Sequence, residues 1–198
     1  MTLRPDLDVI SNWVKPGSSV LDLGCGDGAL LRHLADERNV TGYGLEVNME
    51  KVTQCVRKRV NVLHADLNSG LNAFDENDFD YVVMTHALQM VAEPDKLLLD
   101  MTRVGREVIV TFPNFGNWRT RLSLLGGRMP VTKALPDSWY NTPNIHLCTV
   151  RDFEALCANL DIEVIKPLVL SHSHTPHAIA NLLPNLFGQV AMYHVRKR

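Results

Sequence analysis

Cysteines are few in this sequence, and none of them forms a pair typical of a metal site or a redox motif. The four cysteines, Cys25, Cys55, Cys148 and Cys157, include no C-x-x-C pair. Zinc sites and thioredoxin-like motifs need such short spacings. We therefore predict reduced thiols and no metal centre built on cysteine.

Long hydrophobic runs and an excess of one charge are missing as well. No apolar run approaches the roughly 20 residues needed to span a bilayer, and the opening MTLRPDLDVI lacks the basic-then-apolar pattern of a signal peptide. Lys and Arg number 20 against 22 Asp and Glu, so the net charge is −2 and no general cationic field attracts nucleic acid. We expect a cytoplasmic protein that binds neither membrane nor nucleic acid.

The composition that remains is that of a globular protein. The 198 residues are 45% hydrophobic and 21% charged, which suits one buried core and is too short for two ordinary domains. No repeat or linker divides the chain. We predict a single domain over residues 1–198.

Short apolar runs alternate with helical patterns along the first part of the chain. Near-continuous apolar runs are typical of parallel strands covered on both faces. The order therefore predicts an α/β fold, a doubly wound and mostly parallel sheet of Rossmann-like type. The expected strands are 19–23, 40–46, 62–65, 79–85 and 107–112, with helices over 29–38, 49–59 and 95–104.

The pattern changes over residues 113–148, which are rich in Gly, Pro, Trp and Arg and contain one expected helix, 118–125. A long segment of this kind is usually functional, and its aromatics argue against disorder. A partner surface, a substrate lid and plain packing on the sheet stay open, with the partner surface preferred. The segment's large aromatic and basic side chains are Trp118, Arg119, Arg121, Arg128, Trp139, Tyr140 and His146.

Residues 149–198 are expected to close the fold. Thr149 is placed as a helix N-cap with Asp152 in the capping-box position, and a helix over 151–159 follows. Two late strands, 163–170 and 189–195, bring the predicted sheet to seven strands.

Three histidines in the run HSHTPH invite a metal interpretation. His172, His174 and His177 have no neighbouring carboxylate or cysteine, and Pro176 interrupts the run. Metal sites usually need such additional ligands and supporting groups. A loop cluster without a metal is therefore the preferred interpretation.

A glycine-rich turn is the most informative motif. Residues 20–28, VLDLGCGDG, form a strand that runs into a turn and opens a helix. Gly24, Gly26 and Gly28 permit a sharp turn and let a ligand approach the backbone closely. Gly24, Gly26 and Ala29 also satisfy the dinucleotide pattern G-x-G-x-x-G/A. The turn alone therefore leaves the nature of the ligand open.

Acidic residues at successive strand ends distinguish the possible ligands. Asp22 opposes an incoming pyrophosphate and attracts a cationic amino group. Glu46 follows Gly26 by 20 residues, where a carboxylate accepts hydrogen bonds from ribose hydroxyls. Asp66 and Leu67 follow the third strand, where a carboxylate can accept from an adenine amino group, although Asp66 can also serve only as a cap. This favours S-adenosylmethionine or S-adenosylhomocysteine, and leaves a nicotinamide enzyme as a remote alternative.

His86 directly follows the fourth strand and borders the predicted crevice. It is the best general-base candidate, with a polar wall residue or cap as an equal alternative. Methyl transfer needs mainly alignment of the reactants, so no catalytic residue is assigned. The predicted cofactor-binding residues are Asp22, Gly24, Gly26, Gly28, Glu46, Val47, Asp66, Leu67 and His86.

In this order, VLDLGCGDG, GLE and AD resemble the class I S-adenosylmethionine-dependent methyltransferases over about residues 15–112. The runs LLLDMTRVGREVIVTFPNFGNWRTRLSLLGGRMP and WYNTPNIHLCTVRDFEAL resemble, more narrowly, the methionine biosynthesis protein MetW family. The resemblance implies the methyltransferase fold, with the late strands as an antiparallel edge hairpin. It also implies a role in methionine biosynthesis as partner and activator of homoserine O-acyltransferase (MetX). An active methyltransferase on an unidentified small molecule is the alternative.

Overall fold

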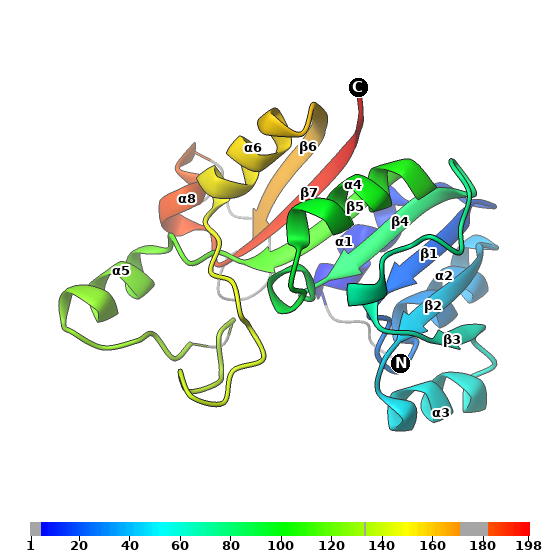
Figure 1. The fold of residues 1–198 in the computed structure, drawn as a ribbon, viewed down its shortest axis with the longest axis horizontal. Coiled ribbons are helices and arrows are strands. Elements are labelled where there is room, and N and C mark those ends of the chain that lie inside the picture. Colours follow the sequence, from blue (N-terminus) through cyan, green and yellow to red (C-terminus); the bar gives the residue numbers. More distant parts are fainter. Residues whose placement is uncertain (1–4, 133, 171–181) are drawn as a thin grey trace.

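A sheet in the strand order β3-β2-β1-β4-β5-β7-β6 organises the molecule (Figure 1). The computed structural model describes residues 5–132, 134–170 and 182–198. Strands β1 to β5 run parallel, whereas β7 is antiparallel to both β5 and β6. The strands are β1 Ser19–Leu23, β2 Thr41–Glu46, β3 Val62–His64, β4 Phe79–Thr85, β5 Gly105–Pro113, β6 Ile162–Leu170 and β7 Val190–Lys197.

Helices cover both faces of this sheet (Figure 1). Helices α4 and α6 contribute to the core on one face, and α1, α2 and α3 to the core on the other. The described helices are α1 Pro5–Trp13, α2 Ala29–Arg38, α3 Met49–Arg57, α4 Pro94–Val104, α5 Trp118–Leu125, α6 Val150–Asn159 and α8 Pro184–Phe187, with 3-10 turns η1 Leu67–Ser69 and η2 Leu88–Met90.

Strand β4 shows why the apolar runs are continuous. Val82 and Met84 pack in the core on the α4 side, and Tyr81 and Val83 pack in the core on the α1 side. All four are buried, so consecutive positions in the middle of the strand need apolar side chains on both faces. The predicted doubly wound, mostly parallel sheet of seven strands is confirmed.

Helix α1 was not expected from the sequence. Pro5 stands at its first position, and Asp6 and Asp8 lie in its first turn, which are ordinary signals of a helix start. Its apolar pattern is too short to predict a helix from the sequence alone. Ile10 and Val14 are buried because they pack against α2 and the sheet.

Past the end of β5, α5 and the chain that follows it extend away from the sheet (Figure 1). The predicted helix over 118–125 is confirmed, and so is the capping box of Thr149 and Asp152 at the start of α6. Of the helices that the structure describes, none has the length and apolarity to cross a bilayer.

Candidate functional site

A cavity of about 800 Å³ opens at the carboxyl ends of β1, β2 and β4. The strand order reverses between β1 and β4, and doubly wound sheets bind their ligands at such a switch point. The volume falls within the roughly 300–1,000 Å³ usual for small-molecule sites. Eight of the nine predicted residues line it: Asp22, Gly24, Gly26, Glu46, Val47, Asp66, Leu67 and His86.

The glycine-rich turn forms one wall of the cavity. Gly24 has a φ of +69° and Gly26 a φ of +60°, a left-handed backbone that residues with a Cβ rarely adopt. The amides of Gly24 and Cys25 both donate to the Leu45 carbonyl, at 2.8 and 3.1 Å. The end of β2 therefore fixes the turn, and bare backbone faces the cavity.

Gly28 lies outside the cavity lining. It is the N-cap of α2 with a φ of +74°, and a Cβ there would lie 3.0 Å from the Cys55 sulfur. The Cys55 thiol donates to the Gly26 carbonyl at 3.2 Å. Gly28 is thus required by the packing of the turn against α3, and contact with a ligand stays a prediction for this residue.

Glu46 is held in a fixed orientation at the cavity wall. Its side chain is buried, with Oε2 accepting from the Gly26 amide and Oε1 from the Asn48 amide, both at 2.9 Å. Each carboxylate oxygen has a further acceptor position. Glu46 can therefore accept two more hydrogen bonds from a ligand without moving.

Asp22 gives the cavity a second buried carboxylate next to the turn. It is 2% exposed. Burial, followed by the negative charge of Asp22, raises the pKa of the Cys25 thiol well above its usual range. The thiol is therefore protonated and a poor nucleophile, and the surroundings of the turn are electronegative.

Asp66 caps a 3-10 turn at the cavity wall, and contact with a ligand stays a prediction for it. Its Oδ1 caps η1 by accepting from the Asn68 amide at 2.9 Å, and the residue also lines the cavity next to Leu67. Capping uses one carboxylate oxygen, so the other oxygen is the one that can contact a ligand.

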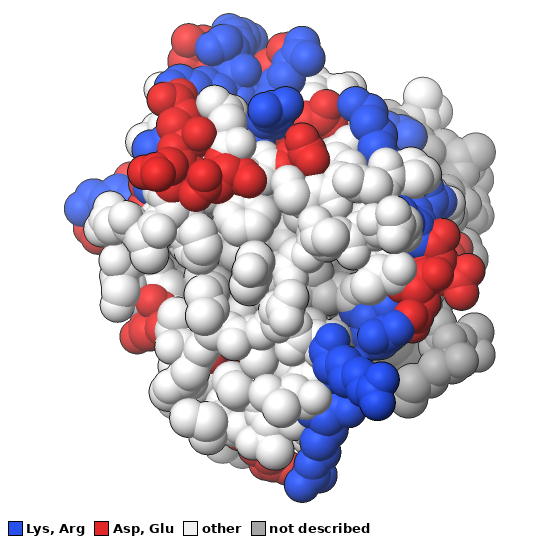
Figure 2. Space-filling model, turned by 90° about the vertical axis from the view of Figure 1, so that its right-hand side faces the viewer, with Lys and Arg blue, Asp and Glu red and all other residues white. Residues whose placement is uncertain are grey.

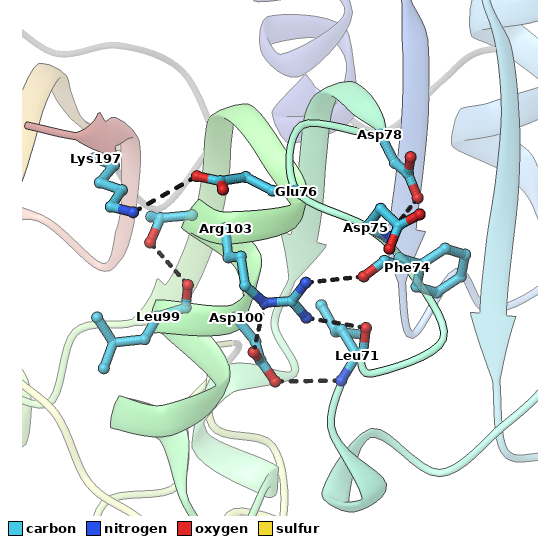
Figure 3. A network of polar contacts seen from close by, with 10 residues as sticks. Leu71, Phe74, Asp75, Glu76, Asp78, Leu99, Asp100, Arg103 and Lys197 are labelled. Atoms are coloured by element: carbon cyan, nitrogen blue, oxygen red, sulfur yellow. Dashed lines mark hydrogen bonds and ion pairs between the residues drawn. The ribbon is translucent and has the colours of Figure 1, made fainter.

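Arg103 of α4 clamps the loop that follows η1 (Figure 3). Its guanidinium donates to the carbonyls of Leu71 at 3.1 Å and Phe74 at 2.8 Å, and it pairs with Asp100 at 3.2 Å. Asp100 in turn accepts from the Leu71 amide at 3.3 Å. This network fixes the loop that begins after η1, on the far side of that turn from Asp66.

His86 lines the cavity in a left-handed conformation, with a φ of +56°. Its amide donates to the Thr111 carbonyl at 3.0 Å, and its Nε2 lies 3.4 Å from Oδ2 of Asp6, a buried residue of α1. Leu7 of α1 also lines the cavity. The helix missed in the sequence therefore supplies part of the site.

An ion pair near the mouth was missed too. Lys58 pairs with Asp27, and this hydrogen bond is the main cause that lowers the pKa of the Asp27 carboxyl. The sequence features that could have predicted this pair are an Asp within the glycine turn and a basic residue at the end of α3. Lining residues not predicted from the sequence include Leu7, Asp27, Lys58, Asn68, Met90 and Val91.

Within the described ranges, no group of three or more His, Cys, Asp or Glu side chains could hold a metal ion. The histidine cluster of His172, His174 and His177 lies outside the described residues. The cavity therefore offers carboxylate acceptors and bare backbone at the turn, and its lining also includes the basic side chains Arg32, Lys51 and Lys58.

The family model for methionine biosynthesis protein MetW matches residues 4–195. The bifunctional methionine biosynthesis protein MetXA/MetW of Rhodopirellula baltica is 37% identical over 174 residues, which cover 83% of this chain and 28% of that protein. The chain thus spans less than a third of this relative's length.

Solved methyltransferase structures share the fold. An S-adenosylmethionine-dependent methyltransferase from Mesorhizobium loti matches with a TM-score of 0.71 at 15% identity, covering 98% of both chains. Phosphoethanolamine N-methyltransferase 2 of Haemonchus contortus, solved with S-adenosyl-L-methionine, matches with a TM-score of 0.71 at 14% identity, covering 97% of this chain and 52% of that one. At such identities the likeness concerns the fold.

Proposed function

The chain belongs to the methionine biosynthesis protein MetW family, and on this premise we propose that its cavity binds S-adenosylmethionine or S-adenosylhomocysteine. We further propose that the protein acts in methionine biosynthesis as partner and activator of homoserine O-acyltransferase (MetX). The geometry of Glu46 supports the first part, and the fused relative supports the second.

The orientation of Glu46 is the observation that carries the cofactor proposal. Two backbone amides, of Gly26 and Asn48, hold its carboxylate beside the glycine turn. The acceptor positions that remain suit the two neighbouring hydroxyls of a ribose. We propose that Asp66, at the next strand end, accepts a hydrogen bond from an exocyclic amine, and the bound cofactor would supply a reactive methyl group.

The acidic surroundings distinguish this ligand from a dinucleotide. Asp22 and Glu46 are both buried next to the turn. A pyrophosphate would bring negative charge against them, whereas an ammonium and a sulfonium would be attracted. The residues present therefore fit a cationic amino-acid nucleoside.

Calorimetry tests the ligand directly. We expect S-adenosylmethionine and S-adenosylhomocysteine to bind one site per chain, and NAD to give no heat. Substituting Asp22→Ala should weaken binding of both nucleosides, because the attraction for the ammonium is lost. Tight binding of NAD, or no binding of either nucleoside, would contradict the proposal.

The partnership with the acyltransferase is tested separately. The name MetXA/MetW describes a single chain of the relative, and fusion keeps two components at high effective concentration. Titrating the acyltransferase of the same organism with this protein should form a complex and raise the rate of acyl transfer. If no complex forms and the rate of acyl transfer does not change, the proposed partnership is wrong.

An active methyltransferase is the second candidate, and the pairing of His86 with Asp6 favours it. A carboxylate 3.4 Å from the ring nitrogen orients an imidazole and supports its role as a base. Incubating a lysate with a labelled methyl donor should then label a metabolite. His86→Gly, which suits the left-handed backbone, should abolish labelling, whereas S-adenosylmethionine should still bind, with reduced affinity, through Asp22, Glu46 and Asp66.

A further inference from the structure

Residues 114–148, here called the α5 arm, expose several large apolar side chains to solvent. Leu125 is 84% exposed, Tyr140 73% and Trp139 72%. Plain packing on the sheet is therefore wrong for these side chains. A soluble chain keeps such a surface mainly where another molecule covers it.

The root of the arm is rigid. The buried amide of Asn114 donates to the Gly188 carbonyl at 2.8 Å, and Asn117 donates to the same oxygen at 3.1 Å. Oδ1 of Asn114 accepts from the amides of Gly116 and Val150, at 2.9 and 3.2 Å. These bonds fix the direction in which α5 leaves the body.

The returning end of the arm is attached as well. The amides of Ile145 and His146 donate to the Gln89 carbonyl, at 2.9 and 3.1 Å, and the Phe115 amide donates to Cys148 at 2.9 Å. With both ends fixed, the arm loses less conformational entropy on binding than a free loop would.

Its composition is that of a protein-binding surface. Trp, Tyr and Arg are the residues enriched at interface hot spots, and here Arg119 lies over the Trp118 ring at 5.3 Å while Trp139 and Tyr140 contact edge to face at 5.7 Å. The arm's sequence holds four basic residues and one acidic residue: Arg119, Arg121, Arg128 and Lys133, and Asp137.

We propose that the α5 arm is the surface on which the homoserine O-acyltransferase docks. The charge of the arm requires a partner with apolar pockets bordered by carboxylates. This chain matches 28% of the length of the fused MetXA/MetW relative. The fusion supports the acyltransferase, rather than a second copy of this chain, as the partner that binds the arm. This inference rests on the partnership proposed above and adds the surface that makes it.

Another face of the molecule, with exposed aliphatic side chains, serves as the comparison surface. Figure 2 views the side of α3 and β3, whose centre carries no Lys, Arg, Asp or Glu. Val56 of α3 is 63% exposed and Leu63 of β3 46%. Both are aliphatic and neither is Trp, Tyr or Arg, the residues enriched at interface hot spots, so we expect them to contribute nothing to docking.

The experiment compares matched variants of the two surfaces in binding to the acyltransferase. Trp139→Ser/Tyr140→Ser should weaken the complex by about 30-fold or more, as expected when hot-spot residues are truncated. Val56→Ser/Leu63→Ser should stay within about 3-fold of the unsubstituted protein. All variants should keep the same affinity for S-adenosylmethionine and the same unfolding midpoint.

The outcomes separate this inference from the function on which it rests. Wild-type complex formation with unchanged binding by the arm variant would overturn the docking surface alone. Loss of the complex only in the Val56/Leu63 variant would assign docking to the other face. No complex with the unsubstituted protein would overturn both. The remaining case is that the arm joins two copies of this chain, which light scattering of the protein alone can detect. A dimer that dissociates in the arm variant, while that variant still binds the acyltransferase, would also overturn the proposal.

Discussion

At the scale of single residues, Glu46 links the glycine turn to the start of α3. Backbone amides from two different segments, Gly26 of the turn and Asn48 at the start of α3, converge on its carboxylate. A hydrogen bond from a backbone amide to a charged carboxylate is stronger than one to a neutral acceptor. The residue that orders the turn is thus also the one that we propose to bind the ribose.

Glu46→Gln tests this dual role. The amide end of Gln turns a donor toward one of the two backbone amides, which removes a charged hydrogen bond worth about 1.5–3 kcal/mol. We expect affinity for S-adenosylmethionine to fall by roughly 10- to 100-fold in calorimetry. Glu50→Gln, on the exposed first turn of α3, should bind as the unsubstituted protein does. Equal affinity of both variants would exclude Glu46 as a ligand contact.

Gly44 is the second position where one atom decides the local structure. A Cβ at Gly44 would lie 2.3 Å from the sulfur of Cys25 and 2.8 Å from its Cβ, so Gly44→Ala must push the turn away from β2. Overpacking of this kind costs about 1–3 kcal/mol. Urea denaturation should show that loss of stability, and calorimetry should show weaker cofactor binding. Thr41→Ala, at an exposed position of the same strand, should change stability by no more than about 0.5 kcal/mol.

At the scale of elements, the site is held by contacts between neighbouring segments. Strand β2 fixes the turn, α1 provides the wall near His86, and α4 holds the loop after η1 through Arg103 (Figure 3). Loops carry the binding groups of doubly wound folds, and the scaffold determines how accurately they are placed.

Arg103→Met tests the loop clamp. Methionine keeps the apolar stem but removes the donors to Leu71 and Phe74, which should lower the free energy of unfolding by about 1.5–3 kcal/mol. Cofactor affinity should also fall a few-fold, because the released loop directly follows η1, the turn that Asp66 caps. Arg106→Met is the matched control, since its pairing with Asp80 is 3.8 Å long and exposed and such pairs contribute about 0–1 kcal/mol. Similar losses in both variants would contradict the clamp.

At the scale of the whole molecule, His194 joins elements that are far apart in the sequence. Its Nε2 lies 2.6 Å from Glu107 of β5, and its ring stacks on Trp13 of α1 with a centroid separation of 5.7 Å. Burial lowers its pKa, the charge of Glu107 raises it, and Lys166 and Lys15 lower it. The neutral imidazole is therefore the form that the folded protein prefers.

This preference predicts a pH dependence of stability. Because the unfolded histidine binds a proton more readily than the folded one, the free energy of unfolding should fall as the pH drops below about 6.5. One group contributes at most about 1.4 kcal/mol per pH unit. Urea midpoints between pH 7.5 and 5.5 should show a shallower slope for His194→Gln. His64→Gln, on the exposed edge strand β3, should keep the full slope, and an unchanged slope in His194→Gln would refute the assignment.

Local sequence patterns sufficed for the sheet and most of the site. Apolar runs separated by helical periods predict parallel strands, and parallel strands end at one edge. Residues at successive strand ends, such as Asp22, Glu46 and Asp66, must then lie near each other. The predicted set consequently lines one cavity, apart from Gly28, whose place below the turn depends on how α3 packs.

The amino-acid sequence by itself determined the alternation of strands and helices from β1 to β5, the glycine turn and the acids beside it, because these depend on neighbours along the chain. Only the tertiary structure decided that α1 closes the site through Asp6 and Leu7. It also decided that the aromatics of the α5 arm face outward, since apolar side chains are buried or exposed according to contacts between distant segments. The burial of His194 has the same origin, in contacts that no local pattern records.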